Sequence, residues 1–169
     1  MQKQNKNELL DFYYIDAKYA DFMRDKSLGD ARVPYTVYPK REKFFIGVVF
    51  KIGDFNYFAP VSSNKEMNPA AISIIDGNES LGSVRINFMF PVIDGVYKQF
   101  IIANIKDRKY KRLVEKQYRF CNKFREQIRG LAQVIYEKRI HGQIKIDKIY
   151  IMDFKKLEKR ALSYKKTKQ

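Results

Sequence analysis

The chain has 169 residues, of which 34 are Lys or Arg and 19 are Asp or Glu, so its formal net charge is +15 at pH 7. A hydrophobic content of 45% supports one folded domain over 1–169, with loose tails expected at 1–8 and 163–169. No run approaches the roughly 20 apolar residues of a membrane span. The polar start lacks the apolar centre of a signal peptide, so we expect a cytoplasmic protein. One Cys excludes an internal disulfide, and one Cys with one His does not supply the usual zinc ligands, so we expect no metal and no cofactor.

Apolar and β-branched runs separated by Gly, Pro and Asp turns dominate the first part of the chain. The Gly53-Asp54 pair between two such runs is typical of a β-hairpin turn. In chain order we predict a strand at 11–15, a short helix at 17–26 with Asp16 as its N-cap, a loop at 27–41, a hairpin of strands at 44–52 and 55–59, a polar loop at 60–69, strands at 71–75 and 82–89, and a further strand at 97–102.

From Asp107 onward the apolar residues recur at helical spacing, which predicts one long helix or two helices broken near Gly130. Ile144–Ile151 alternates weakly and predicts a short strand. Asp153 is expected to cap a last helix at 154–162. Strands first and helices later indicate an α+β fold with a mostly antiparallel sheet.

Nearly all of the net charge lies in the last third of the chain. Residues 106–169 hold 21 Lys and Arg against 7 Asp and Glu, a net of +14, whereas residues 1–105 hold 13 against 12. A basic surface of this density favours a polyanionic partner, most simply nucleic acid. A solvated helical face with a Lys-rich tail would show the same charge, and that plainer interpretation stays open.

Hydroxyls and lysines gather at one end of the predicted hairpin. The chain has no phosphate-binding glycine loop, no HExxH and no CxxC pair, and its single His excludes a ribonuclease site with two histidines. Antiparallel pairing about the Gly53-Asp54 turn brings Lys43 close to Ser62, Ser63 and Lys65. Such a rim could bind a phosphate and stabilise charge during transesterification. The alternative is that these are ordinary loop residues.

Five short motifs make the sequence recognisable. They are Phe-Tyr-Tyr-Ile-x-x-Lys-Tyr (12–19), Lys-Phe-Phe-Ile-Gly-Val-Val (43–49), Tyr-Phe-Ala-Pro-Val-Ser-Ser-Asn-Lys (57–65), Leu-Gly-Ser-Val-Arg-Ile-Asn-Phe-Met-Phe-Pro-Val (81–92) and Tyr-Lys-Arg-Leu-Val-Glu-Lys-Gln (110–117). In this order and spacing they resemble the ToxN/AbiQ family of type III toxin–antitoxin endoribonucleases, over roughly residues 12–160.

The resemblance implies a compact, strongly twisted antiparallel sheet flanked by helices, similar to the Kid/MazF toxins. It implies metal-independent, sequence-selective cleavage of single-stranded RNA, with cellular or phage mRNA as substrate and a 2′,3′-cyclic phosphate as product. It also implies an antitoxin of RNA repeats, which the toxin cuts from a precursor and then binds in a closed, alternating RNA–protein ring. Such systems act against phages by abortive infection, and no protein antitoxin is expected.

The same resemblance implies site residues. The family's loop tyrosine falls on Tyr38, with Tyr35 as a competitor. The catalytic candidates are Tyr19, Tyr38, Lys43, Ser62 and Ser63. The RNA-binding candidates are Lys65, from the same motif as Ser62 and Ser63, and, from the charge of the last third of the chain rather than from the resemblance, Lys109, Lys111, Arg112, Lys116, Arg119 and Lys123.

The mechanism expected from these residues is in-line attack of a ribose 2′-hydroxyl on the adjacent phosphate. Lys43 and Ser63 would stabilise the developing negative charge, while the general acid and base stay unassigned. Two alternatives remain, a catalytically silent RNA-binding protein and an mRNA-cleaving toxin restrained by a protein antitoxin.

Overall fold

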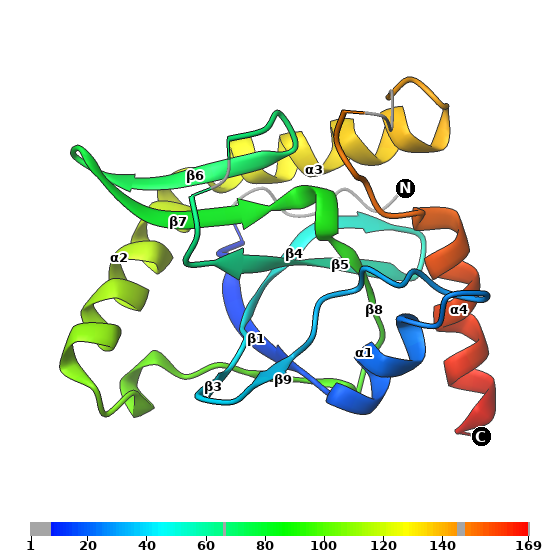
Figure 1. The fold of residues 1–169 in the computed structure, drawn as a ribbon, viewed down its shortest axis with the longest axis horizontal. Helices are drawn as coiled ribbons and strands as arrows, with labels where there is room; N and C mark the ends of the chain where they lie inside the picture. Colours follow the sequence, from blue (N-terminus) through cyan, green and yellow to red (C-terminus); the bar gives the residue numbers. More distant parts are fainter. Residues whose placement is uncertain (1–7, 66, 145–147, 169) are drawn as a thin grey trace.

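The computed structural model describes residues 8–65, 67–144 and 148–168. Its centre is a seven-stranded sheet in which every paired strand is antiparallel to its neighbour, in the order β6-β7-β5-β4-β1-β9, with β8 also paired to β5 (Figure 1). The strands are β1 (Asp11–Ile15), β4 (Phe45–Ile52), β5 (Phe55–Ser62), β6 (Ala71–Asp76), β7 (Glu79–Arg85), β8 (Phe90–Val92) and β9 (Tyr97–Gln99).

Strand β5 is the central strand of this sheet. One edge pairs with β4, whereas the other edge pairs first with β8 at Asn56–Phe58 and then with β7 at Val61–Ser62. The last six residues of β5 are buried, as expected for a strand that is covered on both sides. The end of β5, where Ser62 lies, is therefore held between two neighbouring strands.

In the part of the chain that the structure describes, four α-helices pack around the sheet: α1 (Ala17–Met23), α2 (Arg108–Lys123), α3 (Arg125–Ile140) and α4 (Phe154–Thr167). Three of them begin at an Asp whose carboxylate accepts backbone N–H groups, the preferred chemistry of an N-cap. Helices α2 and α4 lie at opposite ends of the molecule (Figure 1). No helix in the described ranges is long and apolar enough to cross a membrane.

Aromatic side chains join the helices to the sheet. On the α2 side, Phe12 packs edge-to-face on Tyr118 with ring centroids 5.5 Å apart. On the α3 and α4 side, Tyr57 contacts the rings of Tyr136 and Phe154 at 5.6 Å in both cases. The hydroxyls of Tyr57 and Tyr136 both donate to the buried carboxylate of Glu158, at 2.8 and 2.6 Å. These contacts hold α2, α3 and α4 on the sheet.

The structure confirms the strand at 11–15, the hairpin about Gly53-Asp54, and the caps Asp16 and Asp153. Several boundaries were wrong. β5 continues through Pro60 to Ser62, because β7 pairs with its last two residues. The strand expected at 82–89 is instead β7, a 3₁₀ turn at Ile86–Phe88 and β8. The loop at 27–41 holds the two-residue strand β2 (Val37–Tyr38), which pairs with β3 (Arg41–Glu42).

The helical part also differs from the prediction. The break between α2 and α3 falls at Phe124, and Gly130 lies inside α3. Helix α1 ends at Met23 rather than at Lys26. Of the strand predicted at 144–151, residues 145–147 lie outside the described residues, and 148–151 are not a strand. The segment from Ser163 to Thr167 is not a loose tail but the end of α4, with Tyr164 buried against Tyr19 and Phe22.

Candidate functional site

Lys43 occupies the short link between β3 and β4. Its backbone N–H donates to the carbonyl of Thr36 at 2.8 Å, which continues the β2–β3 pairing by one residue. Its Nζ lies 5.7 Å from the centre of the exposed Tyr38 ring. Burial, and after it the positive charge of Arg85, lowers the pKa of the Lys43 ammonium below its usual value. A lysine in this setting can hold an anion and can exchange a proton more readily than a solvated lysine.

Residues 62–65, which we call the serine turn, follow the end of β5. Phe45 pairs with Pro60, and the N–H of Val61 donates to the carbonyl of Phe44 at 3.3 Å. Continuing this register by one residue places Lys43 level with Ser62. Ser63 and Lys65 are exposed in the turn. The local register thus places the backbone of Lys43 beside the first residue of the serine turn.

Ser62 has a different role from Ser63. It is only 7% exposed, and its Oγ accepts a hydrogen bond from the N–H of Asn64 at 3.1 Å. That bond shapes the turn. The geometry therefore favours Ser63 for contact with a substrate and Ser62 for support.

Strand β7 packs against the serine turn. None of its residues was among the site residues predicted from the sequence. Ser83 pairs with Ser62, and its hydroxyl donates to the carbonyl of Asn64 at 2.9 Å. The backbone of Gly82 packs so closely on the turn that a Cβ there would lie 2.0 Å from the carbonyl oxygen of Ser62. Arg85 is close enough to Lys43 to lower its pKa. The one available signal was the motif at 81–92, which contains all three residues but does not reveal their roles.

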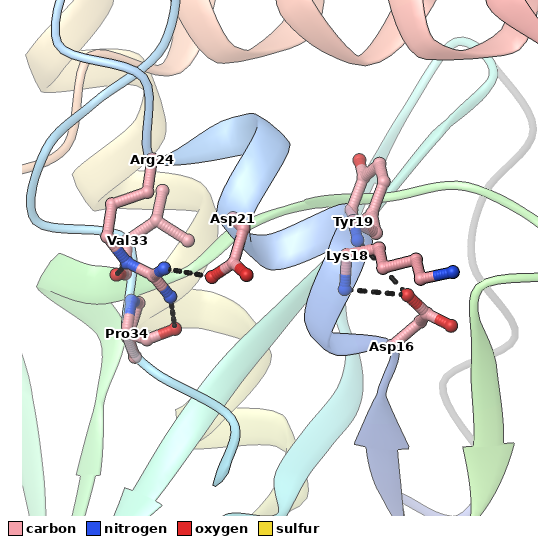
Figure 2. A network of polar contacts seen from close by, with 7 residues as sticks. All are labelled: Asp16, Lys18, Tyr19, Asp21, Arg24, Val33 and Pro34. Carbon is pink, nitrogen blue, oxygen red and sulfur yellow. Dashed lines mark hydrogen bonds and ion pairs between the residues drawn. The ribbon is translucent and has the colours of Figure 1, made fainter.

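The structure does not bring Tyr19 into this group. Tyr19 is 0% exposed, donates its hydroxyl to the carbonyl of Pro91 at 2.6 Å, and packs edge-to-face on Tyr164. Burial raises the pKa of its phenol. Figure 2 shows it on α1, where its backbone N–H donates to the Asp16 cap. Tyr19 is therefore a core residue in this structure, and a direct catalytic contact with RNA is not supported.

Tyr35, the competitor of Tyr38, belongs to a separate cluster. Its ring is exposed on the loop before β2 and lies 3.8 Å from the guanidinium carbon of Arg24. Arg24 is itself fixed by the carbonyls of Val33 and Pro34, at 2.7 and 2.8 Å, and by the carboxylate of Asp21 (Figure 2). Tyr38, and not Tyr35, is the tyrosine next to Lys43.

A basic groove of about 650 Å³ lies along α2. Leu81, next to Gly82, lies at one wall, and Arg41, two residues before Lys43, lies at another. The Arg41 guanidinium stacks over the Tyr110 ring at 4.6 Å. The charged lining residues are Arg41, Arg108, Lys109, Arg112 and Lys116, with Asp107 and Glu79.

Only part of the predicted basic face lines this groove. Lys109, Arg112 and Lys116 do, and Lys116 also pairs with Asp76 at 2.8 Å. Lys111, Arg119 and Lys123 are not among its lining residues, because they lie elsewhere around or farther along the helix. Within the described ranges, no three His, Cys, Asp or Glu side chains are grouped so that they could hold a metal ion.

Comparison with known proteins identifies the family. The model of the ToxN toxin family, described as toxin ToxN of type III toxin–antitoxin systems, matches residues 11–162. The chain belongs to this family. It is 28% identical over 170 residues to the endoribonuclease ToxN of Bacillus thuringiensis subsp. kurstaki, covering 94% of this chain and 86% of that protein.

Two solved structures share the fold at 26% identity, each covering 94% of this chain and 99% of the other. One, with a TM-score of 0.81, concerns selective toxin inhibition by a non-coding RNA pseudoknot in a type III system. The other is AbiQ, a lactococcal anti-phage endoribonuclease of a type III system, with a TM-score of 0.82. The family predicted from the five motifs is therefore confirmed, as is its mixed fold of helices and antiparallel sheet.

Proposed function

We propose that this protein is the endoribonuclease toxin of a type III toxin–antitoxin system. It cleaves single-stranded RNA without a metal, in a sequence-selective manner, and leaves a 2′,3′-cyclic phosphate. The observation that carries the proposal is the register that places Lys43 level with the start of the serine turn, close in the chain to Arg41 and Leu81 of a basic groove. Membership of the ToxN family supports it independently.

The chemistry follows from the residues of the site. RNA supplies its own nucleophile, the 2′-hydroxyl, so the protein must orient the scissile phosphate and stabilise charge on its non-bridging oxygens. Lys43 and Ser63 provide a cation and a hydroxyl donor for that charge, and Lys65, which is exposed, adds a second cation. Tyr38, next to Lys43, offers a ring on which an unpaired base can stack.

The partner proposed for the groove is an antitoxin RNA made of repeats, which the toxin processes and then holds in a closed RNA–protein assembly. The inhibition of a related toxin by an RNA pseudoknot supports this choice over a protein antitoxin. We also propose a twisted core sheet akin to that of the Kid/MazF toxins, a cytoplasmic location, and action against phages by abortive infection.

The test of the reaction is digestion of single-stranded RNA by the purified toxin in excess chelator, with analysis of the product ends. We expect full activity and 2′,3′-cyclic phosphate ends. Loss of cleavage in chelator, or 5′-phosphate products, would overturn the mechanism. A protein that binds RNA but never cuts it would be the silent RNA-binding alternative. Tandem repeats just upstream in the DNA, rather than a small open reading frame, are expected if the antitoxin is RNA.

The test of the groove compares two double variants that remove the same charge from α2. Lys109→Gln with Arg112→Gln alters the groove, whereas Arg119→Gln with Lys123→Gln alters α2 outside it. Each phosphate contact to a single strand contributes about 0.7 to the slope of log affinity against log salt, so the groove variant should lose about 1.4. The matched control should lose clearly less. Equal losses would mean that the groove is not the RNA-binding surface.

A further inference from the structure

Ser83 is a buried hydroxyl directly behind the serine turn. It lies on β7 opposite Ser62, and 0% of its surface is exposed. Its Oγ donates to the carbonyl of Asn64 at 2.9 Å. Asn64 separates Ser63 from Lys65, so this hydrogen bond joins the middle of the turn to the sheet.

The two hydrogen bonds at Asn64 do different things. The bond from its N–H to Ser62 Oγ, at 3.1 Å, lies inside the turn and sets its local shape. It cannot orient the turn relative to Lys43. The bond from Ser83 can, because β7 and β4 are both paired to β5 and so belong to one sheet. The backbone of Gly82 also packs closely against the Cα of Ser63, which holds the same turn against β7.

We propose that Ser83 is a positioning residue for RNA cleavage, whose hydroxyl holds the serine turn so that Ser63 and Lys65 meet the same phosphate as Lys43. The inference rests on the proposed function of this turn. Ser83 is wholly buried and does not contact RNA, so it acts through Asn64. A displacement of about 1 Å at a reacting group can lower the rate of cleavage about a hundredfold, and an exposed turn without its anchor is free to move that far.

The test uses Ser83→Ala, which removes the donor, and Ser83→Thr, which keeps a hydroxyl. The control is Ser73→Ala, the same deletion on β6 at the residue that pairs with Ser83. In Ser83→Ala we expect kcat to fall about tenfold or more while KM and RNA affinity change less than about twofold, because orientation and not binding is lost. The pH dependence of kcat should keep the same apparent pKa values as in the parent. Ser83→Thr should restore most of kcat, and Ser73→Ala should leave it unchanged.

Two results would overturn the proposal: a kcat for Ser83→Ala within twofold of the parent, or an equal loss in Ser73→Ala. A second readout needs no activity. Hydrogen exchange of the Asn64 amide, followed by NMR, should be faster in Ser83→Ala than in the parent, since the turn opens more often. Unchanged protection would also refute the anchor. If the parent cuts no RNA, the proposed function fails, and the exchange rates alone decide whether Ser83 fixes the turn.

Discussion

Gly82 is the position at which a single methyl group should damage the site without removing any functional atom. Its φ is +118°, a conformation that side chains rarely adopt, and a Cβ there would lie 2.0 Å from the carbonyl oxygen of Ser62 and 3.2 Å from the Cα of Ser63. Both neighbours are backbone, so no side-chain rotation can relieve the contact. In Gly82→Ala the serine turn must move away from β7.

The expected cost follows from two terms. A non-glycine residue in a strained backbone conformation costs about 1–3 kcal/mol. Forcing packed backbone apart adds about 1–3 kcal/mol. For a chain of this size each kcal/mol lowers Tm by roughly 2–4 °C, so the sum corresponds to a fall of roughly 4–24 °C. The shift needed to reach ordinary contact exceeds about 1 Å, which is enough to lower kcat about a hundredfold.

The matched control is Gly53→Ala. Gly53 also has a positive φ, +53°, but its Cβ would meet no described heavy atom within 4 Å apart from those of Gly53 and its two chain neighbours, and it turns the β4–β5 hairpin at the end opposite the serine turn. This variant should lose only about 1–2 kcal/mol from the left-handed conformation, and its cleavage should be unchanged. Thermal melts and single-turnover RNA cleavage measure both effects. If Gly82→Ala cleaves RNA as fast as Gly53→Ala, the close packing of β7 on the turn does not matter for activity.

Three further outcomes are expected. Ser63→Ala should abolish RNA cleavage and toxicity on induced expression, yet leave the melting temperature nearly unchanged because the side chain is exposed; a fully toxic variant would remove Ser63 from the site. Arg85→Gln should raise the pKa of Lys43 by removing a repelling charge. If protonated Lys43 stabilises the phosphate, the fall in the cleavage rate at alkaline pH should move to higher pH in this variant. A fall at the same pH as in the parent would contradict an effect of Arg85 on Lys43. Tyr136→Phe should lower stability by about 1–3 kcal/mol in urea unfolding, since buried Glu158 loses a hydrogen-bond donor at 2.6 Å, while cleavage persists; unchanged stability would mean that Tyr57 and Lys155 satisfy Glu158 without Tyr136.

Local chemistry explains which parts of the fold could be predicted from the sequence. Asp16 and Asp153 indicate the starts of helices in the sequence, because an N-cap carboxylate accepts backbone N–H groups only two or three residues away. The break at Phe124 has no such local signal. Asn122 donates to and accepts from the backbone of Leu10, 112 residues earlier, and so fixes the end of α2 against the start of β1. Gly130, the expected break, is exposed and needs no special conformation, so α3 passes through it.

The residues of the site also fall into those that local sequence predicts and those that it does not. Lys43 and the serine turn could be brought to the same end of the hairpin from the sequence, because the two strands that carry them pair about one tight turn. The exact partner of Lys43 could not, because the register shifts between Ile46 and Phe50. Nothing local indicates that Ser83 and Gly82 support that turn, since they reach it by way of a separate hairpin, β6–β7, which adds to the other edge of β5. Tyr19 shows the converse: its motif predicts function, but its place on α1 turns the ring into the core against Tyr164.

The position of the charge has a similar physical explanation. Helix α2 places a basic residue at nearly every exposed position, so periodicity alone cannot tell which cations meet RNA. Residues from distant segments decide it: with Arg41 on β3 and Leu81 on β7, the groove is lined by residues of α2 only as far as Lys116. Because β3 leads into Lys43 and β7 packs against the serine turn, we expect an RNA strand in the groove to lie close to the site where we propose that it is cut. The basic groove and the proposed site at Lys43 and the serine turn are therefore connected through β3 and β7, and not through α2 itself.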